Sequence, residues 1–94
     1  MKSYFLEEVT GDLARVRREL SKLLPVQTDP WVLFAANADP MAYFDLTSER
    51  PGTFDIQADV SSRHLNEDTA VLEVLRELQK QLGGIVRDDD DNEL

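Results

Sequence analysis

The chain has 94 residues, of which 41% are hydrophobic and 31% charged, and it contains no cysteine. This length suits one domain with its own core, and the lack of cysteine excludes disulfides, thiolate metal sites and cysteine nucleophiles. The net charge of −9 repels phosphate backbones and anionic lipids, so we expect no nucleic-acid or membrane binding and instead a partner with a basic surface.

The first segment has apolar residues at helical spacing over residues 3–24. On a helical wheel one arc holds Phe5, Leu6, Val9, Leu13, Val16, Leu20, Leu23 and Leu24. This spacing favours one helix that is capped by Ser3 and ended by Pro25. The alternative is a short strand over residues 3–9, with a helix that starts after Gly11.

Three short strands are expected next. Residues 31–36 are apolar throughout, which predicts a strand covered on both faces, with Trp31 in the core. Residues 42–47 and 54–60 alternate between apolar and polar, which predicts strands with one buried and one wet face. A hairpin loop over residues 48–52, containing Pro51 and Gly52, joins these two strands.

A second helix follows, capped by Asn66 and ended by the pair Gly83 and Gly84. Its apolar face is formed by Val71, Leu72, Leu75, Leu78 and Leu82. Ile85 and Val86 suffice for one short strand, which could join either edge of the sheet. The expected fold class is α+β, a two-layer sandwich of helix, three-stranded antiparallel meander, helix and short strand (α-β-β-β-α-β), in a single domain over residues 1–87.

Residues 88–94 are expected to form an acidic, disordered tail, because adjacent like charges repel. Its acids are Asp88, Asp89, Asp90, Asp91 and Glu93. Asp88, Asp90 and Asn92 match the first three ligand positions of a calcium-binding loop. The sixth-position glycine and the twelfth-position glutamate are both missing, so we interpret the match as coincidence.

No residue pattern indicates catalysis, a cofactor or a metal. His64 is the single histidine, and the nearby Ser61 and Ser62 lie in a polar connection without a nucleophile elbow. A surface histidine, or one at the start of a helix, is the simpler interpretation. Asp59 and His64 lack any further ligand at an established metal spacing. We therefore expect a protein that is not an enzyme.

The wet face of the meander is the strongest candidate for a binding site. If the hairpin closes symmetrically, Asp45 faces Asp55 and Tyr43 faces Gln57. Two opposed carboxylates destabilise a sheet by an appreciable fraction of ~1 kcal/mol. This cost favours a different register or simple solvation. The functional alternative is an acidic docking surface with an aromatic anchor, formed by Tyr43, Asp45, Asp55, Gln57 and Asp59.

These features favour a small acidic binding module that docks a basic partner protein. In size, charge and lack of cysteine alone, the chain resembles small bacterial immunity proteins and similar inhibitors. Two alternatives remain: an accessory or self-associating subunit, such as a dimer sealed along residues 31–36, and a small enzyme dependent on a divalent cation. The N-terminus lacks the features of a signal peptide and no apolar run approaches ~20 residues, so a cytoplasmic location is expected.

Overall fold

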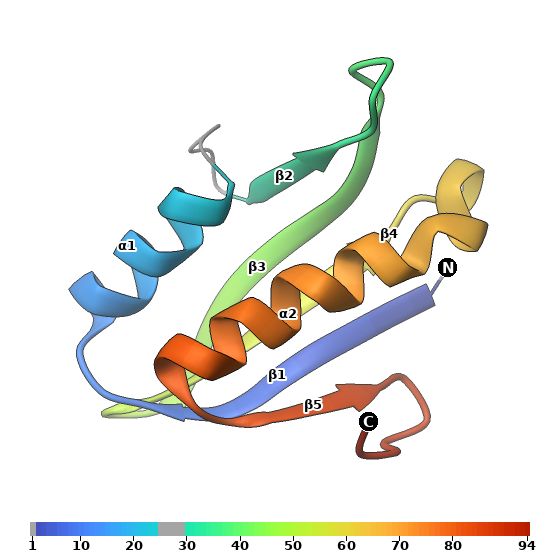
Figure 1. The fold of residues 1–94 in the computed structure, drawn as a ribbon. Coiled ribbons are helices and arrows are strands. Elements are labelled where there is room, and N and C mark those ends of the chain that lie inside the picture. The colour runs from blue at the N-terminus through green and yellow to red at the C-terminus, as the bar shows by residue number, and fades with distance from the viewer. Residues whose placement is uncertain (1, 25–29) are drawn as a thin grey trace.

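Five antiparallel strands form one sheet, and two α-helices pack against it, in a computed structural model that describes residues 2–24 and 30–94 (Figure 1). The α+β class is confirmed, but the order begins with a strand and includes five strands. In chain order the elements are β1 Lys2–Thr10, α1 Leu13–Leu23, β2 Trp31–Phe34, β3 Pro40–Arg50, β4 Thr53–Val60, the 3₁₀ helix η1 Ser62–Glu67, α2 Asp68–Leu82 and β5 Ile85–Asp88.

The favoured long helix over residues 3–24 is wrong, and the alternative strand is correct. β1 is the fourth strand in the order β2-β3-β4-β1-β5, paired with β4 on one side and β5 on the other. Its ladder with β4 shifts register between Leu6 and Val9, and Glu8 there has a φ of 61°. This β-bulge lets Leu6 and Val9 both face the core although they are three positions apart. The bulge therefore produces the spacing that resembled a helix.

α1 begins after a turn at Gly11, whose φ is 135°. Asp12 caps the helix, because its side chain accepts a hydrogen bond from the N–H of Ala14 at 3.1 Å. Ser3 therefore caps no helix. Pro25, the expected end of the helix, lies outside the described residues.

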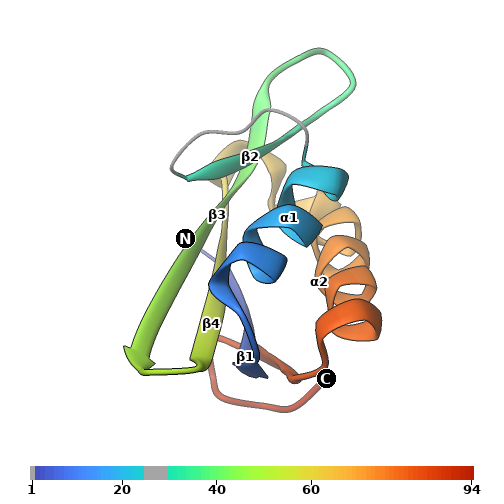
Figure 2. The same cartoon turned by 90° about the vertical axis from the view of Figure 1, so that its left-hand side faces the viewer.

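Both helices lie on the same side of the sheet, which leaves a helical layer and a sheet layer (Figure 2). The core between the layers is formed by inward side chains of all five strands and by the apolar sides of both helices. Trp31 is fully buried there, as predicted, with its indole N–H 3.3 Å from the Ser21 hydroxyl and the Arg17 guanidinium 5.0 Å from its ring centre. Within the described residues, no helix covers the opposite face of the sheet.

The apolar run at residues 31–36 is not covered on both faces. β2 is an edge strand of four residues, and the Phe34 side chain is 40% exposed. The chain continues into a turn closed by the Ala35 N–H, which donates to the Asp39 carbonyl at 2.8 Å. The hydrophobicity of residues 31–36 alone did not show whether this strand lies at the edge or in the middle of the sheet.

The β3–β4 hairpin has a tighter turn than expected. Arg50 pairs with Thr53 around Pro51 and Gly52, and a bulge interrupts the ladder between Thr47 and Arg50. The positive φ of 79° at Gly52 suits the second central position of such a turn. As a result the register differs by two residues from symmetric closure, while the predicted inward and outward faces of both strands are kept.

The second helix begins later than predicted, because Ser62–Glu67 forms a separate 3₁₀ helix. Asn66 lies inside that helix, so it does not cap α2, whose first residue is Asp68. The predicted end is confirmed: Gly83 has a φ of 77°, and its N–H donates to the Gln79 carbonyl at 2.8 Å. The predicted short strand is also present as β5, which joins the sheet beside β1.

Candidate docking face

The side of the sheet away from the helices, here called the open face, brings together outward side chains of β3, β4, β1 and β5. Across one row, Tyr43 lies opposite Asp59 and Asp59 lies opposite Ser3. In the next row the partners are, in order, Asp45, Gln57, Phe5 and Arg87. Thr47 lies opposite Asp55 in a third row. All five predicted partner-binding residues therefore share this face.

The two aspartates predicted to oppose each other do not. Asp45 pairs with Gln57, so Asp55 and Asp59 are its diagonal neighbours along β4. Residues two apart in a strand are separated by about 6.6 Å, so the three carboxylates are spaced across the face rather than pressed together. The destabilising pair inferred from the symmetric hairpin is thereby avoided.

Hydrogen bonds orient two of these carboxylates. Asp59 accepts from the Ser3 hydroxyl at 2.7 Å and from the Gln57 side-chain amide at 2.9 Å. Asp55 accepts from the main-chain N–H of Glu8 at 3.1 Å, which places it against the β1 bulge. Among the described residues, no lysine or arginine lies within ion-pairing distance of Asp55 or Asp59. Both acids are half-buried.

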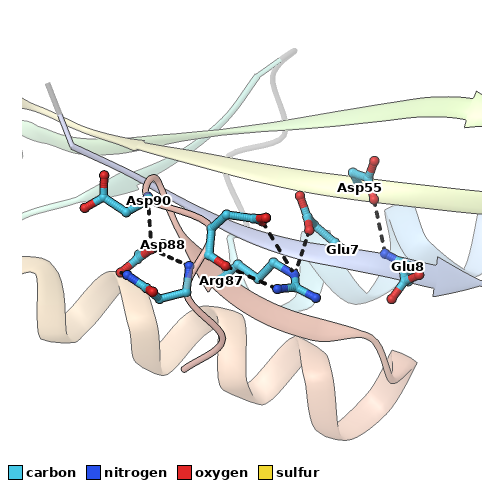
Figure 3. A network of polar contacts seen from close by, with 8 residues as sticks. Glu7, Glu8, Asp55, Arg87, Asp88 and Asp90 are labelled. Atoms are coloured by element: carbon cyan, nitrogen blue, oxygen red, sulfur yellow. Dashed lines mark hydrogen bonds and ion pairs between the residues drawn. The ribbon is translucent and has the colours of Figure 1, made fainter.

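A polar hollow of about 290 Å³ lies at the bulge end of the open face. Arg87 is one of its lining residues, with its Nε 3.1 Å from the Glu7 carboxylate and 3.9 Å from that of Asp91 (Figure 3). Burial raises the pKa of Glu7, and the charge of Asp55 raises it further, while Arg87 opposes both effects. The remaining lining residues are Glu8, Arg50, Thr53 and Asp55. This end of the face already holds its own cations, in contrast to the end at Asp59.

No protein-family model matches the chain, and no curated protein or solved structure is significantly similar to it.

His64 is buried in η1, with 8% of its surface exposed, so a surface position is wrong, whereas the alternative position at the start of a helix agrees with η1, which leads into α2. Its Nδ1 lies 3.3 Å from the Glu67 carboxylate, and its Nε2 lies 3.9 Å from that of Asp39. Ser61 caps η1 by accepting from the N–H of Arg63. Asp59 is held on the open face by other partners, so the structure does not bring Asp59 and His64 together as ligands.

Residues 88–94, expected as a tail, follow a definite path back to β5. The Asp88 carboxylate accepts from the N–H groups of Asp90 at 3.0 Å and Asn92 at 2.9 Å (Figure 3), and the bond from Asn92 holds the pKa of Asp88 below its ordinary value. The main chain of Glu93 forms an isolated antiparallel β-bridge with that of Arg87, and the Leu94 N–H donates to the Val86 carbonyl at 2.9 Å. Asp88 and Asn92 thus close a turn. The domain boundary at residue 87 stays a prediction.

No group of three or more histidine or acidic side chains in residues 2–24 and 30–94 is arranged to hold a metal ion. In the same ranges, no helix is both long and apolar enough to span a bilayer.

Proposed function

We propose that this chain is a small, non-enzymatic binding module that docks a basic surface of another protein through its open face. The observation that carries the proposal is the placement of Asp45, Asp55 and Asp59 on two adjacent strands, on a sheet face that no helix of the described residues covers. Charged groups arranged in this way attract a surface of opposite sign and align it during encounter.

Aromatic and polar groups on the same face support the proposal. Tyr43 is 38% exposed, and on this face it lies opposite Asp59 and two residues before Asp45 in β3. Interfaces commonly combine an aromatic anchor, which is buried on binding, with charged groups that set the partner and the orientation. The net charge of −9 favours the same class of partner over the whole molecule.

The test is affinity capture from the native cell extract at low salt, with release at high salt. The variant Asp45→Lys/Asp55→Lys reverses the charge of the open face. We expect it to retain less than about a tenth of the partner that the unchanged chain captures, because like charges then face the partner's basic surface. Because Asp55→Lys removes the hydrogen bond from the Glu8 N–H at the bulge, we expect the isolated chain to lose about 1 kcal/mol of stability and to stay folded.

A matched control reverses two acids on the helical layer, in the variant Glu73→Lys/Glu77→Lys. It has the same net charge as the open-face variant, so capture should be kept if the position of the charge matters. Equal capture by the open-face variant, or equal loss in both variants, would contradict the proposal. Circular dichroism of each variant excludes unfolding as the cause of a loss.

A second candidate is a self-associating or accessory subunit, favoured by the exposed Phe34 on the edge strand β2. Edge strands with exposed apolar side chains readily pair with another chain. The same capture experiment includes an untagged copy of this chain. Retention of that copy, with loss in the variant Phe34→Glu, would support self-association in place of a basic partner.

A further inference from the structure

The carboxylate of Asp59, on the open face, is held in place by hydrogen bonds from described residues to only one of its two oxygens. The Ser3 hydroxyl and the Gln57 amide both donate to the same oxygen of Asp59, Oδ1. The other oxygen, Oδ2, has no hydrogen-bond donor among the described residues. A carboxylate can accept about four hydrogen bonds, so Asp59, which accepts two from the described residues, retains about half of its capacity in a fixed orientation.

An exposed aromatic ring stands beside this carboxylate. Tyr43 is directly opposite Asp59 in the β3–β4 ladder, which brings their Cβ atoms to about 5 Å of each other. On the other side Tyr43 lies opposite Val32 of β2, so an aliphatic side chain flanks the ring. The hydroxyl of Tyr43 has no partner among the described residues, and its ring surface is accessible to a ligand.

Electrostatics separates this end of the face from the other. At the Glu7 end, Arg87 already pairs with Glu7 and Asp91, whereas Asp59 has no ion-pair partner in the described part of the chain. A cation can therefore bind Asp59 without displacing a cation of the chain itself. A flat ring beside an oriented carboxylate suits a guanidinium group better than an ammonium group. The guanidinium is planar, so it can stack on the ring while its N–H groups donate to the carboxylate.

We infer that Tyr43 and Asp59 form a socket for an arginine side chain of the partner. The guanidinium stacks on the Tyr43 ring and donates to Oδ2 of Asp59, while Ser3 and Gln57 hold the carboxylate in position. This inference rests on the proposed function and deepens it, because it replaces a generally basic partner by one that presents an arginine.

The experiment compares two peptides of equal charge, acetyl-tetraarginine amide and acetyl-tetralysine amide, by NMR titration of the full chain at low ionic strength. We expect tetraarginine to bind about fivefold more tightly, as an exposed guanidinium–ring contact contributes an effect of that order. The largest shifts should occur at residues 43 and 59. The variants Asp59→Asn and Tyr43→Leu should each reduce the preference to about one.

The control variant Glu73→Gln removes an exposed acid from α2 and should leave the fivefold preference unchanged. Two variants are used because Asp59→Asn could disturb the bonds to Ser3 and Gln57, whereas Tyr43→Leu leaves them intact. Equal affinity for the two peptides, or a preference that survives both variants, would overturn the arginine socket.

The socket and the docking function can fail separately. If both peptides bind equally and both are lost in Asp45→Lys/Asp55→Lys, the open face still docks cations and only the arginine inference is wrong. If tetraarginine is preferred but Asp45→Lys/Asp55→Lys captures as much partner as the unchanged chain, the docking function is wrong.

Discussion

Asp68, the first residue of α2, binds two side chains of β1 at once. It accepts from the Tyr4 hydroxyl at 2.6 Å and from the Lys2 ammonium group at 2.9 Å. These bonds hold the pKa of Asp68 below its ordinary value, the bond from Tyr4 having the larger effect. Burial is the main cause that raises the pKa of Tyr4. The contact thus fixes the start of the helix on β1, an interior strand next to the edge strand β5.

Replacing Tyr4 by Phe removes one donor to this carboxylate and leaves the ring in the core. We expect a loss of about 1.5 kcal/mol in the free energy of unfolding at pH 7, measured by urea denaturation, because the acceptor is charged. The lowered pKa means that ionised Asp68 stabilises the fold above about pH 3.9, its ordinary value, and that this contribution is lost as the pH falls through the native pKa. The difference between the two proteins should therefore shrink below pH 4.

The control is Tyr43→Phe, which deletes a hydroxyl without a partner among the described residues. Its unfolding free energy should stay within about 0.5 kcal/mol of the unchanged protein. A loss from Tyr4→Phe that is the same at pH 7 and below pH 4 would show that the charge of Asp68 is not what stabilises the contact.

At the scale of elements, the bulge of β1 explains why a helix was wrongly predicted over residues 3–24. It also explains why position 84 requires glycine. A regular strand has a period of two, but the extra residue at Glu8 changes the spacing of Leu6 and Val9 to three. Sequence alone offers no sign of this bulge, because non-glycine residues with positive φ are uncommon. The strands with unbroken alternation, such as Thr53–Val60, were predictable for the same physical reason.

For the candidate site, the face on which the residues lie was predictable, but their pairing across the strands was not. The alternation of β3 and β4 correctly placed Tyr43, Asp45 and Asp59 on one outward face. The register was not predictable, because it depends on the bulge next to the two-residue turn. Ser3 was missed, since its position became a part of the sheet only once β1 was known to be a strand.

Gly84, between α2 and β5, packs against the bulge. A Cβ atom there would lie 2.7 Å from the main-chain carbonyl oxygen of Glu7 and 3.1 Å from side-chain atoms of Leu6 and Val9. Its φ of 96° adds backbone strain for any other residue. We expect Gly84→Ala to lower the free energy of unfolding by about 3 kcal/mol or more, measured by urea denaturation, because backbone cannot yield as a side chain can.

Gly83→Ala is the matched control for this effect. Gly83 also has a positive φ, of 77°, but nothing lies within 4 Å of an added Cβ. With its ψ of −160°, Gly83 has a backbone conformation nearly restricted to glycine, so its cost should be about 2 kcal/mol, that of the backbone conformation alone. Equal losses at the two positions would mean that the approach of Gly84 to β1 is not a constraint on the fold.

At the scale of the whole molecule, a net charge of −9 is confined to a small volume. The radius of gyration of the Cα atoms is 12.3 Å. Electrostatic interactions extend about 30 Å at 0.01 M salt but only about 8 Å at 0.15 M. At low salt the charges therefore repel one another across the entire molecule, and at physiological salt they interact only with their neighbours.

Raising NaCl from 0.01 M to 0.15 M should therefore increase the melting temperature, since screening relieves the self-repulsion of the folded state more than that of the expanded unfolded chain. A gain of about 1 kcal/mol corresponds to roughly 4–8 °C for a domain of this size, which calorimetry resolves. Ion pairs such as Lys2–Asp68 oppose the effect, because salt weakens them. A variant with Asp45→Asn and Asp55→Asn carries less charge and should show a smaller rise. A melting temperature that falls with salt would show that local ion pairs outweigh net repulsion. The acidic surface would then not destabilise the fold at low salt.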